Sequence, residues 1–322
     1  MKKIDFASYI KKYGIFLALV ILVVYFTSVS DVFLTPSNLF NVARQVSFLG
    51  IAAVGMTFTL LLGGIDLSIG SIISLVNVVC ASLMVKNGMS PFAACVISLV
   101  MSTILGFLNG WAIANIGIPP IIVTLCAMTI WEGVAYILSK GLPIFGFPAS
   151  FSVIGQGYLG VVPVPVIIMV FILIIGSVIL NKTYFGRYFY AVGGNEDAAF
   201  LSGIIVKRVK YLAYTLSGFF AGVAGIVILS RTNSGQALAG KGFEFSVLTA
   251  IALGGVSVNG GVGKVFNIVA GVFIIGVLTN GLVIMNVSQY VQLVIKGLVL
   301  FAAVAFDMLQ KDGKLDFGKR KI

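Results

Sequence analysis

The sequence predicts an all-α integral membrane protein with about ten transmembrane helices, one of them short or broken. Hydrophobic residues make up 59% of the 322 residues and charged residues only 10%, whereas about a quarter of the residues are charged in an ordinary soluble domain. Apolar stretches close to the ~20 residues that a helix needs to cross the hydrocarbon recur along the chain. We expect a single polytopic domain over residues 1–322.

Polar residues, glycines and prolines separate the apolar stretches, which sets the expected spans. The eighth span is too short to cross as a full helix. A connection at 140–162 contains prolines and glycines and is expected to form an ordered, turn-rich cap. The expected spans are 13–30, 44–63, 67–85, 91–114, 120–139, 163–181, 211–230, 245–256, 265–285 and 289–306.

The net charge of +11 is concentrated in short connections and near both ends of the chain, which is typical of the positive-inside pattern rather than of a nucleic-acid-binding surface. Threading the spans from a cytoplasmic amino terminus places most basic residues inside. Both tails, 1–12 and 307–322, and a connection at about 182–210 are then cytoplasmic. The basic residues left outside are Arg44, Lys86, Lys140, Arg231 and Lys241.

The chain lacks the residues of several common sites. It contains no histidine, which excludes Ser-His-Asp and Cys-His catalytic sets and histidine metal sites. A glycine-rich stretch at 254–264 fails as a nucleotide loop, because Val258 and Val265 stand where Gly and Ser or Thr are needed. We expect no enzyme activity, metal or cofactor on this chain. The cysteines lie in apolar segments and are expected to pack there: Cys80, Cys95 and Cys126.

Residues 193–203 carry both a helix start and a helix stop. Asn195 can cap free amides, Glu196 and Asp197 complement the positive end of the helix dipole, and Gly203 can adopt the left-handed conformation that ends a helix. These signals predict a helix of about two turns. It is either a docking element or a surface helix in the lipid interface.

Two glycine-rich interruptions are candidate hinges or parts of a solute path. In the first, at 63–71, Asp66 or Ser68 could cap the next helix, and glycines permit a tight re-entry. We interpret Asp66 as a cap and the segment as a structural hinge, although non-helical backbone can also line a cavity. The candidates in both interruptions are Gly64, Asp66, Ser68, Gly70, Gly254 and Gly255.

Ionisable side chains are few within the expected spans. Glu132 and Lys296 lie inside spans, and Asp66 and Glu244 lie nearer span ends. A charge in hydrocarbon is costly and indicates a polar cavity or a buried partner. A Glu132–Lys296 ion pair is one possibility, and we expect structural pairing rather than a transport role for both.

Three stretches resemble the monosaccharide permeases of ABC importers, the ribose permease group in particular. They are 54–57 continuing through 64–71, then 183–188 with 193–204, and finally 252–257 with 260–264. The likeness runs in matching order from about residue 35 to the end of the last span. One departure is the run Glu196-Asp197-Ala198-Ala199, where many relatives place Glu-Ala-Ala directly.

The resemblance implies a bundle like that of type II ABC importers in a bacterial cytoplasmic (inner) membrane. Such a subunit pairs with a second, identical or related permease, and partner ATPases carry the ATP and Mg²⁺. An extracytoplasmic solute-binding protein delivers a ribose-like sugar, which crosses by alternating access. The short helix then resembles the coupling helix that docks on the ATPase, with the residues Gly194, Asn195, Glu196, Asp197, Ala198, Ala199, Leu201, Ser202 and Gly203.

Other functions stay open at this point. Related permeases carry nucleosides, branched amino acids or a furanose-like quorum signal. An ion-coupled secondary transporter would need paired carboxylates within the membrane, and Glu132 alone is a poor coupling set. A membrane-embedded enzyme is disfavoured because no catalytic constellation is present.

Overall fold

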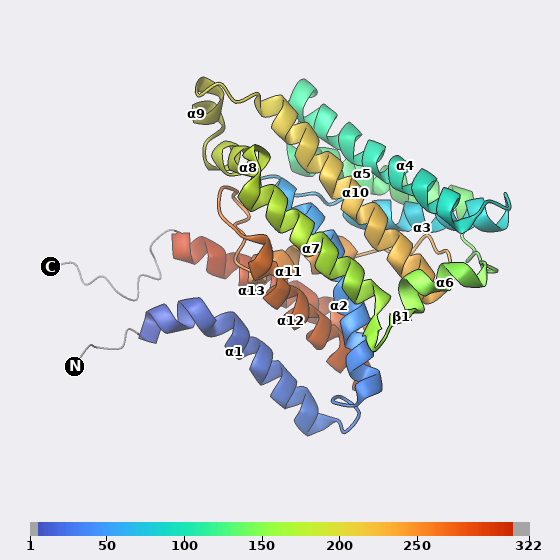
Figure 1. Ribbon diagram of the computed structural model, residues 1–322. Coiled ribbons are helices and arrows are strands. Elements are labelled where there is room, and N and C mark those ends of the chain that lie inside the picture. Colours follow the sequence, from blue (N-terminus) through green and yellow to red (C-terminus); the bar gives the residue numbers. More distant parts are fainter. Residues whose placement is uncertain (1–5, 312–322) are drawn as a thin grey trace.

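The computed structural model describes residues 6–311, with side chains described for residues 14–309. Its long helices lie side by side in one bundle (Figure 1). In chain order the elements are α1 (Phe6–Val29), α2 (Pro36–Leu61), α3 (Ile69–Val85), α4 (Pro91–Trp111), the π-helical turn η1 (Ala112–Ile116), α5 (Pro120–Ser139), α6 (Ala149–Gln156), β1 (Tyr158–Leu159), β2 (Val162–Pro163), α7 (Val164–Lys182), α8 (Tyr184–Gly194), α9 (Glu196–Leu201), α10 (Val206–Thr232), α11 (Phe243–Leu253), α12 (Val265–Ile284) and α13 (Gln289–Lys311).

The helices match the expected membrane spans. Among the described residues, seven helices are long and apolar enough to cross a membrane, namely α2, α4 with η1, α5, α7, α10, α12 and α13. Shorter apolar helices are the described part of α1 (Gly14–Val29), α3 and α11. Each expected span coincides with one of these helices, which confirms the all-α membrane class. Proline stands in the first two positions of α2, α4, α5 and α7, where its fixed φ favours helix initiation.

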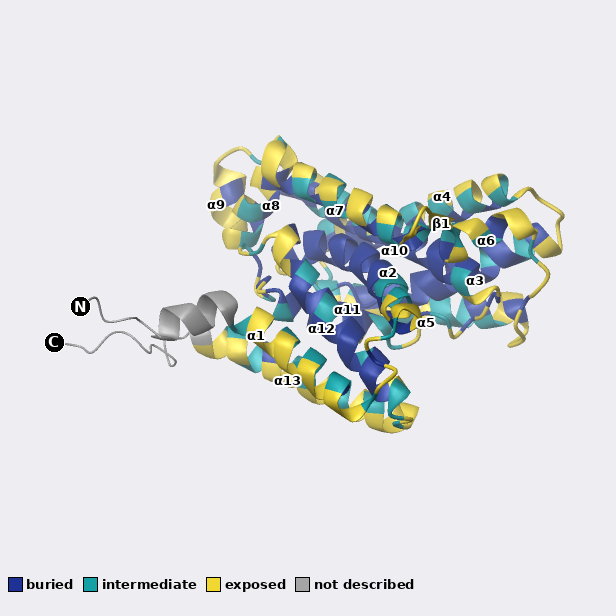
Figure 2. Cartoon of the chain, turned by 60° about the horizontal axis from the view of Figure 1, so that its bottom comes forward, coloured by how far each residue is buried: buried dark blue, intermediate teal, exposed yellow. Residues whose placement is uncertain are grey.

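The helices divide into a buried centre and an apolar periphery. Most residues in the apolar windows of α2, α10 and α12 are buried, whereas α4, α5, α7 and α13 bury less than a third of theirs (Figure 2). The exposed side chains of the outer helices include large apolar ones such as Ile130, Phe171 and Phe301. Such a surface is suited to contact with lipid or with another membrane-embedded chain.

The centre of the bundle is packed closely through small residues. A Cβ atom on Gly106 of α4 would overlap the carbonyl oxygen of Tyr214 of α10, and one on Gly218 would overlap that of Ser102. Glycine at these positions lets the two helix backbones approach, which is a common way for helices to pack in membranes. The long α10 is thereby fixed against α4, and it also packs on α2 and α3.

The eighth span is broken, as the sequence predicts. After α10 the chain runs without helix through residues 233–242 and alongside α3, where the amide of Gln236 donates to Asn77 Oδ1 (3.0 Å) and that of Gly240 to Ser74 Oγ (2.9 Å). Helix α11 then covers only Phe243–Leu253. Ser74 lies eleven residues before the end of α3, or about 16 Å along that helix, so this connection reaches well inside the membrane.

The position of Lys241 therefore differs from the prediction. Threading of the spans placed Lys241 in an external connection, but the residue follows Gly240 at the depth of Ser74. The polar side chains of α3 satisfy the backbone of the connection, which allows it to enter the bundle without helical hydrogen bonds. The length of an apolar run does not reveal this kind of pairing.

The other connections are ordered. At one end, α6 and the β1–β2 hairpin occupy the expected cap, and Ser230 Oγ of α10 donates to the carbonyl of Phe151 (2.6 Å). At the other end, α8 and α9 lie together, and α1 begins and α13 ends on the same side as they do (Figure 1). Helix α8 has no counterpart in the predicted elements. Thr183 caps it by accepting the amide of Gly186 (3.4 Å).

Candidate functional site

The expected short helix is α9, and its capping follows the sequence signals. Asn195 Oδ1 accepts the amide of Ala198 (2.8 Å) at the amino end. At the carboxyl end Gly203 has φ of 85°, and its amide and that of Ile204 donate to the carbonyls of Phe200 (2.9 Å) and Ala199 (3.1 Å). This pair of bonds is a Schellman motif, which a glycine in the left-handed region permits. The predicted helix is confirmed at Glu196–Leu201.

Helix α9 projects from the end of the bundle. Within it Ala199 is buried and the other residues are exposed, including Phe200 at 68% and Leu201 at 84%. Two exposed apolar side chains next to each other on a short polar helix form a surface suited to contact with another protein. The expected coupling residues Gly194, Asn195, Glu196, Asp197, Ala198, Ala199, Leu201, Ser202 and Gly203 therefore lie in one protruding segment.

Glu196 is tied to the rest of the chain. Lys210 Nζ of α10 lies 2.7 Å from Glu196 Oε1, with the two side chains 20% and 53% exposed. Asp197 is exposed and makes no ion pair among the described side chains. The two neighbouring acids thus differ, because Glu196 holds α9 against α10 whereas Asp197 is available to another molecule.

Helix α8 fixes the base of this segment to the bundle. Tyr190 donates its hydroxyl to the carbonyl of Gly263 (2.7 Å), and burial raises the pKa of Tyr190, which keeps the donor proton in place. Gly193 lies so close to the carbonyl of Leu61 that any side chain there would overlap it. The amide of Gly261 donates to the same carbonyl (2.9 Å). The ends of α2 and α8 and the connection before α12 therefore meet at one point.

Asp66 lies in a buried polar group rather than at a helix cap. Its Oδ1 accepts the amide (3.0 Å) and hydroxyl (2.6 Å) of Ser68, and its Oδ2 accepts the hydroxyl of Ser217 on α10 (2.6 Å). Ser68 Oγ accepts Asn109 Nδ2 of α4 (2.9 Å). Ser68 stands at the start of α3 but makes no side-chain cap bond. We call Asp66, Ser68, Asn109 and Ser217 the Asp66 junction, which joins the α2–α3 connection to α4 and α10.

The hinge glycines serve close packing and turns. Gly64 lies against the Tyr214 hydroxyl, and a Cβ on Gly70 would overlap both the carboxylate of Glu244 and the carbonyl of Gly240. Gly254 packs on α12 and Gly255, with φ of 76°, forms the turn that ends α11. The structure thus brings Gly70 to the broken eighth span but leaves Gly254 and Gly255 at the far end of α11.

The two ionisable residues singled out within spans do not pair with each other. Glu132 Oε1 of α5 lies 3.4 Å from Lys241 Nζ, whereas Lys296 lies half-buried on α13. The Glu132–Lys296 pair considered from the sequence is therefore wrong, because Lys241 reaches Glu132 from the descending connection. Sequence reasoning missed Lys241 as the partner of Glu132; the available signal was that Lys241 and Glu244 lie three residues apart at the start of an apolar segment.

A family model described as the permease component of the branched-chain amino acid transport system matches residues 38–304. The chain belongs to this permease family. The match runs from the first turn of α2 into α13 and so includes the helices that position both α9 and the Asp66 junction. The permease is therefore a component of a transport system, and it is a multi-pass membrane protein.

Curated relatives are similar to the permease over most of their length. It is 42% identical over 308 residues to a ribose import permease protein of Bacillus subtilis, covering 95% of each chain. It is 38% identical over 316 residues to a D-allose transport system permease protein of Escherichia coli, covering 96% of this chain and 95% of the relative. An L-arabinose transport system permease protein of Escherichia coli is 38% identical over 282 residues, or 88% and 86% of the two chains. These relatives confirm the likeness to the ribose permease group. No solved structure matches the chain.

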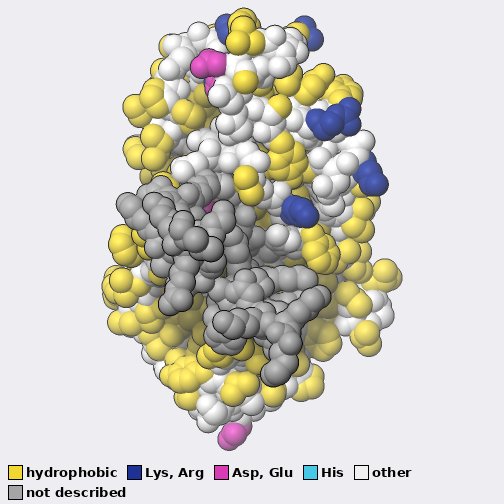
Figure 3. Space-filling model, turned by 90° about the vertical axis from the view of Figure 1, so that its left-hand side faces the viewer, with side chains coloured by type: hydrophobic (Ala, Val, Ile, Leu, Met, Phe, Trp, Pro, Cys, Tyr) yellow, Lys and Arg dark blue, Asp and Glu magenta, His cyan; other side chains and the backbone are white. Residues whose placement is uncertain are grey.

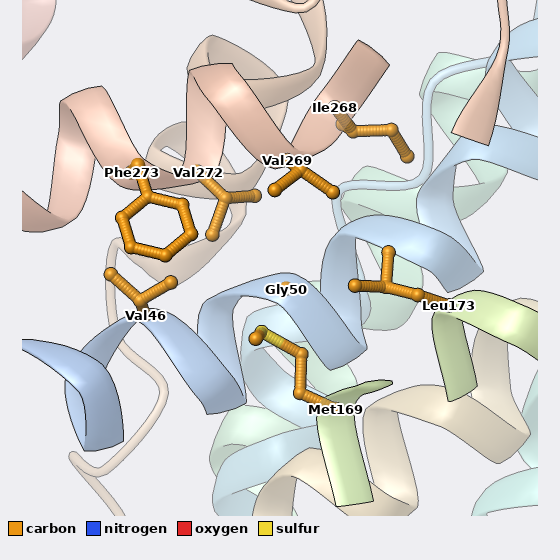
Figure 4. Close-up of a pocket in the computed structure, with 8 residues that line it drawn as sticks. All are labelled: Val46, Gly50, Met169, Leu173, Ile268, Val269, Val272 and Phe273. Carbon is orange, nitrogen blue, oxygen red and sulfur yellow. The ribbon is translucent and has the colours of Figure 1, made fainter. Parts of the chain in front are cut away.

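Two cavities of the permease are apolar. One, of about 10 Å³, lies where α2, α7 and α12 meet, between Gly50, Met169 and Val272 (Figure 4). That volume is about the least that a single water needs. A larger groove of about 580 Å³ between α7 and α10 is lined by isoleucines, phenylalanines, Leu216 and Val223. Neither lining offers the hydrogen-bond donors and acceptors that a polar solute requires.

Proposed function

We propose that the permease is the membrane subunit of an ATP-driven importer for a small sugar of the ribose type. The observation that carries this proposal is the near full-length similarity to permeases named for ribose, D-allose and L-arabinose. The solute path would run between two permease subunits, identical or related. A furanose-like signal or a nucleoside is the alternative solute.

ATP and Mg²⁺ would bind to partner ATPases, and α9 would be the element through which they act on the permease. The exposed Phe200 and Leu201 provide the apolar contact, and Asp197 provides a free charge. Only residues 202–205 separate α9 from α10, and the Glu196–Lys210 pair adds a second attachment. A force on α9 would therefore reach α10, the helix that packs on α2, α3 and α4, and alternating access would follow from rocking of the two subunits.

The α9 end would face the cytoplasm, with both tails on the same side. It carries Lys and Arg side chains on its surface (Figure 3), and such residues accumulate on the cytoplasmic side of membrane proteins. An extracytoplasmic solute-binding protein would then dock at the opposite end, where α6 and the β1–β2 hairpin lie. The basic residues at the α9 end are Lys182, Arg187, Lys207, Arg208, Lys210 and Lys264.

Co-purification of the tagged permease with its ATPase tests the coupling role. We expect Leu201→Ala and Asp197→Lys to reduce the amount of ATPase retained in mild detergent, and Leu142→Ala to leave it unchanged. Leu142 is a suitable control because it is also an exposed leucine, at 68% against 84% for Leu201, and lies at the opposite end of the bundle. Glu196 is not substituted here, since its loss would also detach α9 from α10. Full retention of the ATPase by both α9 variants would refute the docking role.

Uptake by the reconstituted complex tests the transport role. Proteoliposomes containing permease, ATPase and binding protein are expected to accumulate ribose or a related monosaccharide only with internal ATP. Nucleosides and furanose signals are tested in parallel. Accumulation driven by an ion gradient through the permease alone would instead identify a secondary transporter.

A further inference from the structure

The ion pair between Glu132 and Lys241 lies at membrane depth on an open face of the subunit. The carboxylate and ammonium are 3.4 Å apart, and their side chains are 29% and 63% exposed. Glu132 is seven residues from the end of α5 at Ser139, which is about 10 Å along the helix. Lys241 follows Gly240, whose amide binds Ser74 well inside the span of α3. Both charges are thus within the hydrocarbon zone and neither is enclosed by its own chain.

A face of this kind is poorly suited to lipid. Charged side chains in the hydrocarbon are costly, and they normally face the inside of a bundle or a water-filled cavity. The non-helical connection 233–242 that carries Lys241 is itself exposed at Gln236 and Leu238. Irregular backbone at this depth is tolerated where it is buried in protein or lines water. Both observations therefore indicate that this face meets protein or water rather than lipid.

The backbone beside Glu132 and Lys241 also has free space around it. A Cβ atom on Gly133, next to Glu132, or on Gly242, next to Lys241, would meet no atom within 4 Å. Helix α5 packs chiefly on α3, and the described part of the chain leaves its other sides largely uncovered. The backbone next to each charged residue is therefore open to another molecule.

A buried acid, Glu244, lies near the pair. Glu244 is 4% exposed, and its carboxylate packs against Gly70 in the first turn of α3. In its ionised form it attracts Lys241 and repels Glu132. Lys241 thus lies among two carboxylates while its ammonium has three N–H donors, so donors remain after the contact with Glu132.

We infer that the face bearing Glu132 and Lys241 lines the aqueous solute path and that this pair binds hydroxyl groups of a neutral sugar during its passage. The inference rests on the proposed function. Each sugar hydroxyl both donates and accepts, and the pair offers a charged acceptor next to charged donors. A neutral polyhydroxy solute fits it best, because an ion of either sign would be repelled by one member.

Cysteine labelling tests whether the face is aqueous. The assembled importer in nanodiscs carries Gly133→Cys, with Cys80, Cys95 and Cys126 replaced by Ala. The matched control carries Leu298→Cys on α13, where the side chain is 63% exposed. The thiolate is the reactive form and requires hydration. A charged, membrane-impermeant thiol reagent should therefore modify the cysteine at position 133 at least roughly tenfold faster than the cysteine at position 298. Saturating ribose should slow that reaction.

Equal or slower modification of position 133 would overturn the inference, since the face would then meet lipid or a dry subunit interface. Labelling does not depend on transport. A complex that imports none of the sugars but labels rapidly at position 133 would refute the proposed substrate and the pair's binding role, while supporting an aqueous path. Slow labelling in a complex that imports ribose would refute the path and leave the proposed function standing.

Uptake kinetics test the contact with solute. Glu132→Gln and Lys241→Gln should each raise the KM for sugar roughly tenfold or more, as for loss of a hydrogen bond to a charged group, and Lys140→Gln should not. The exchange variant Glu132→Lys with Lys241→Glu retains an ion pair but exchanges donors and acceptors. We expect its KM to stay raised. Recovery of the original KM would show that the pair is only structural and would overturn its binding role.

Discussion

Helix α9 and the Asp66 junction differ in where the residues that define them lie in the sequence. Each hydrogen bond that caps α9 joins residues within 195–204, and the helix is exposed. In the Asp66 junction two bonds are local, from Ser68 to Asp66, but the other two join residues 41 and 151 positions apart, and all four members are buried. Substitutions in α9 should therefore act on a local element, whereas those in the junction should act on the whole bundle.

The largest loss of stability is expected from Asp66→Ala. The substitution removes the carboxylate that accepts three hydrogen bonds, so the hydroxyls of Ser68 and Ser217 lose this acceptor. At about 1 kcal/mol for each buried bond, the folded state should lose about 3 kcal/mol or more. Thermal unfolding of the detergent-purified permease measures the loss. Asp197→Ala, which removes an exposed acid, serves as control. Equal unfolding temperatures for the two variants would contradict the difference between a local α9 and a junction that stabilises the whole bundle.

A smaller loss is expected from Gly70→Ala. The added methyl group would overlap the Glu244 carboxylate and the Gly240 carbonyl. The Gly240 carbonyl belongs to the backbone and cannot move away as easily as a side chain. Overpacking of this kind costs about 1–3 kcal/mol. The same unfolding assay applies, with Gly297→Ala as control, because a Cβ there meets nothing within 4 Å. The control should be neutral or stabilised by up to about 1 kcal/mol through better helix propensity, so destabilisation of both variants alike would refute the packing argument.

The same contrast explains which features the sequence could predict. Apolar length gave the spans, and the neighbouring signals of Asn195 and Gly203 gave α9 with its ends. The partner of Asp66 could not be predicted, because Ser217 is one of many small polar residues in apolar segments and only packing of α10 selects it. Lys241 was misplaced for a related reason, since side chains of α3 draw its connection into the bundle. Residues 1–5 and 312–322 of the predicted tails lie outside the described part of the chain.

Loss of the α9 cap through Asn195→Ala should have a modest and local effect. The substitution removes the bond to the Ala198 amide, and loss of such a cap costs about 1 kcal/mol. Hydrogen–deuterium exchange of residues 196–203 should become about fivefold faster, while exchange around the Asp66 junction should not change. Faster exchange throughout the bundle would show that α9 is not an independent local element.

The smallest effect is expected from Lys210→Gln, which removes the second attachment of α9. The Glu196–Lys210 pair is partly exposed, and such pairs contribute about 0.5 kcal/mol, so exchange in α9 should rise by a factor of about two. Lys207→Gln is the matched control, because Lys207 carries the same charge on the same helix but contacts Asn115 rather than Glu196. Salt at about 0.5 M should reduce the difference between the two variants, since exposed pairs are screened. If the two variants still differ in exchange rate at high salt, Lys210 holds α9 by packing of its aliphatic chain. If they do not differ even at low salt, the pair does not attach α9, and residues 202–205 are the connection through which α9 moves α10.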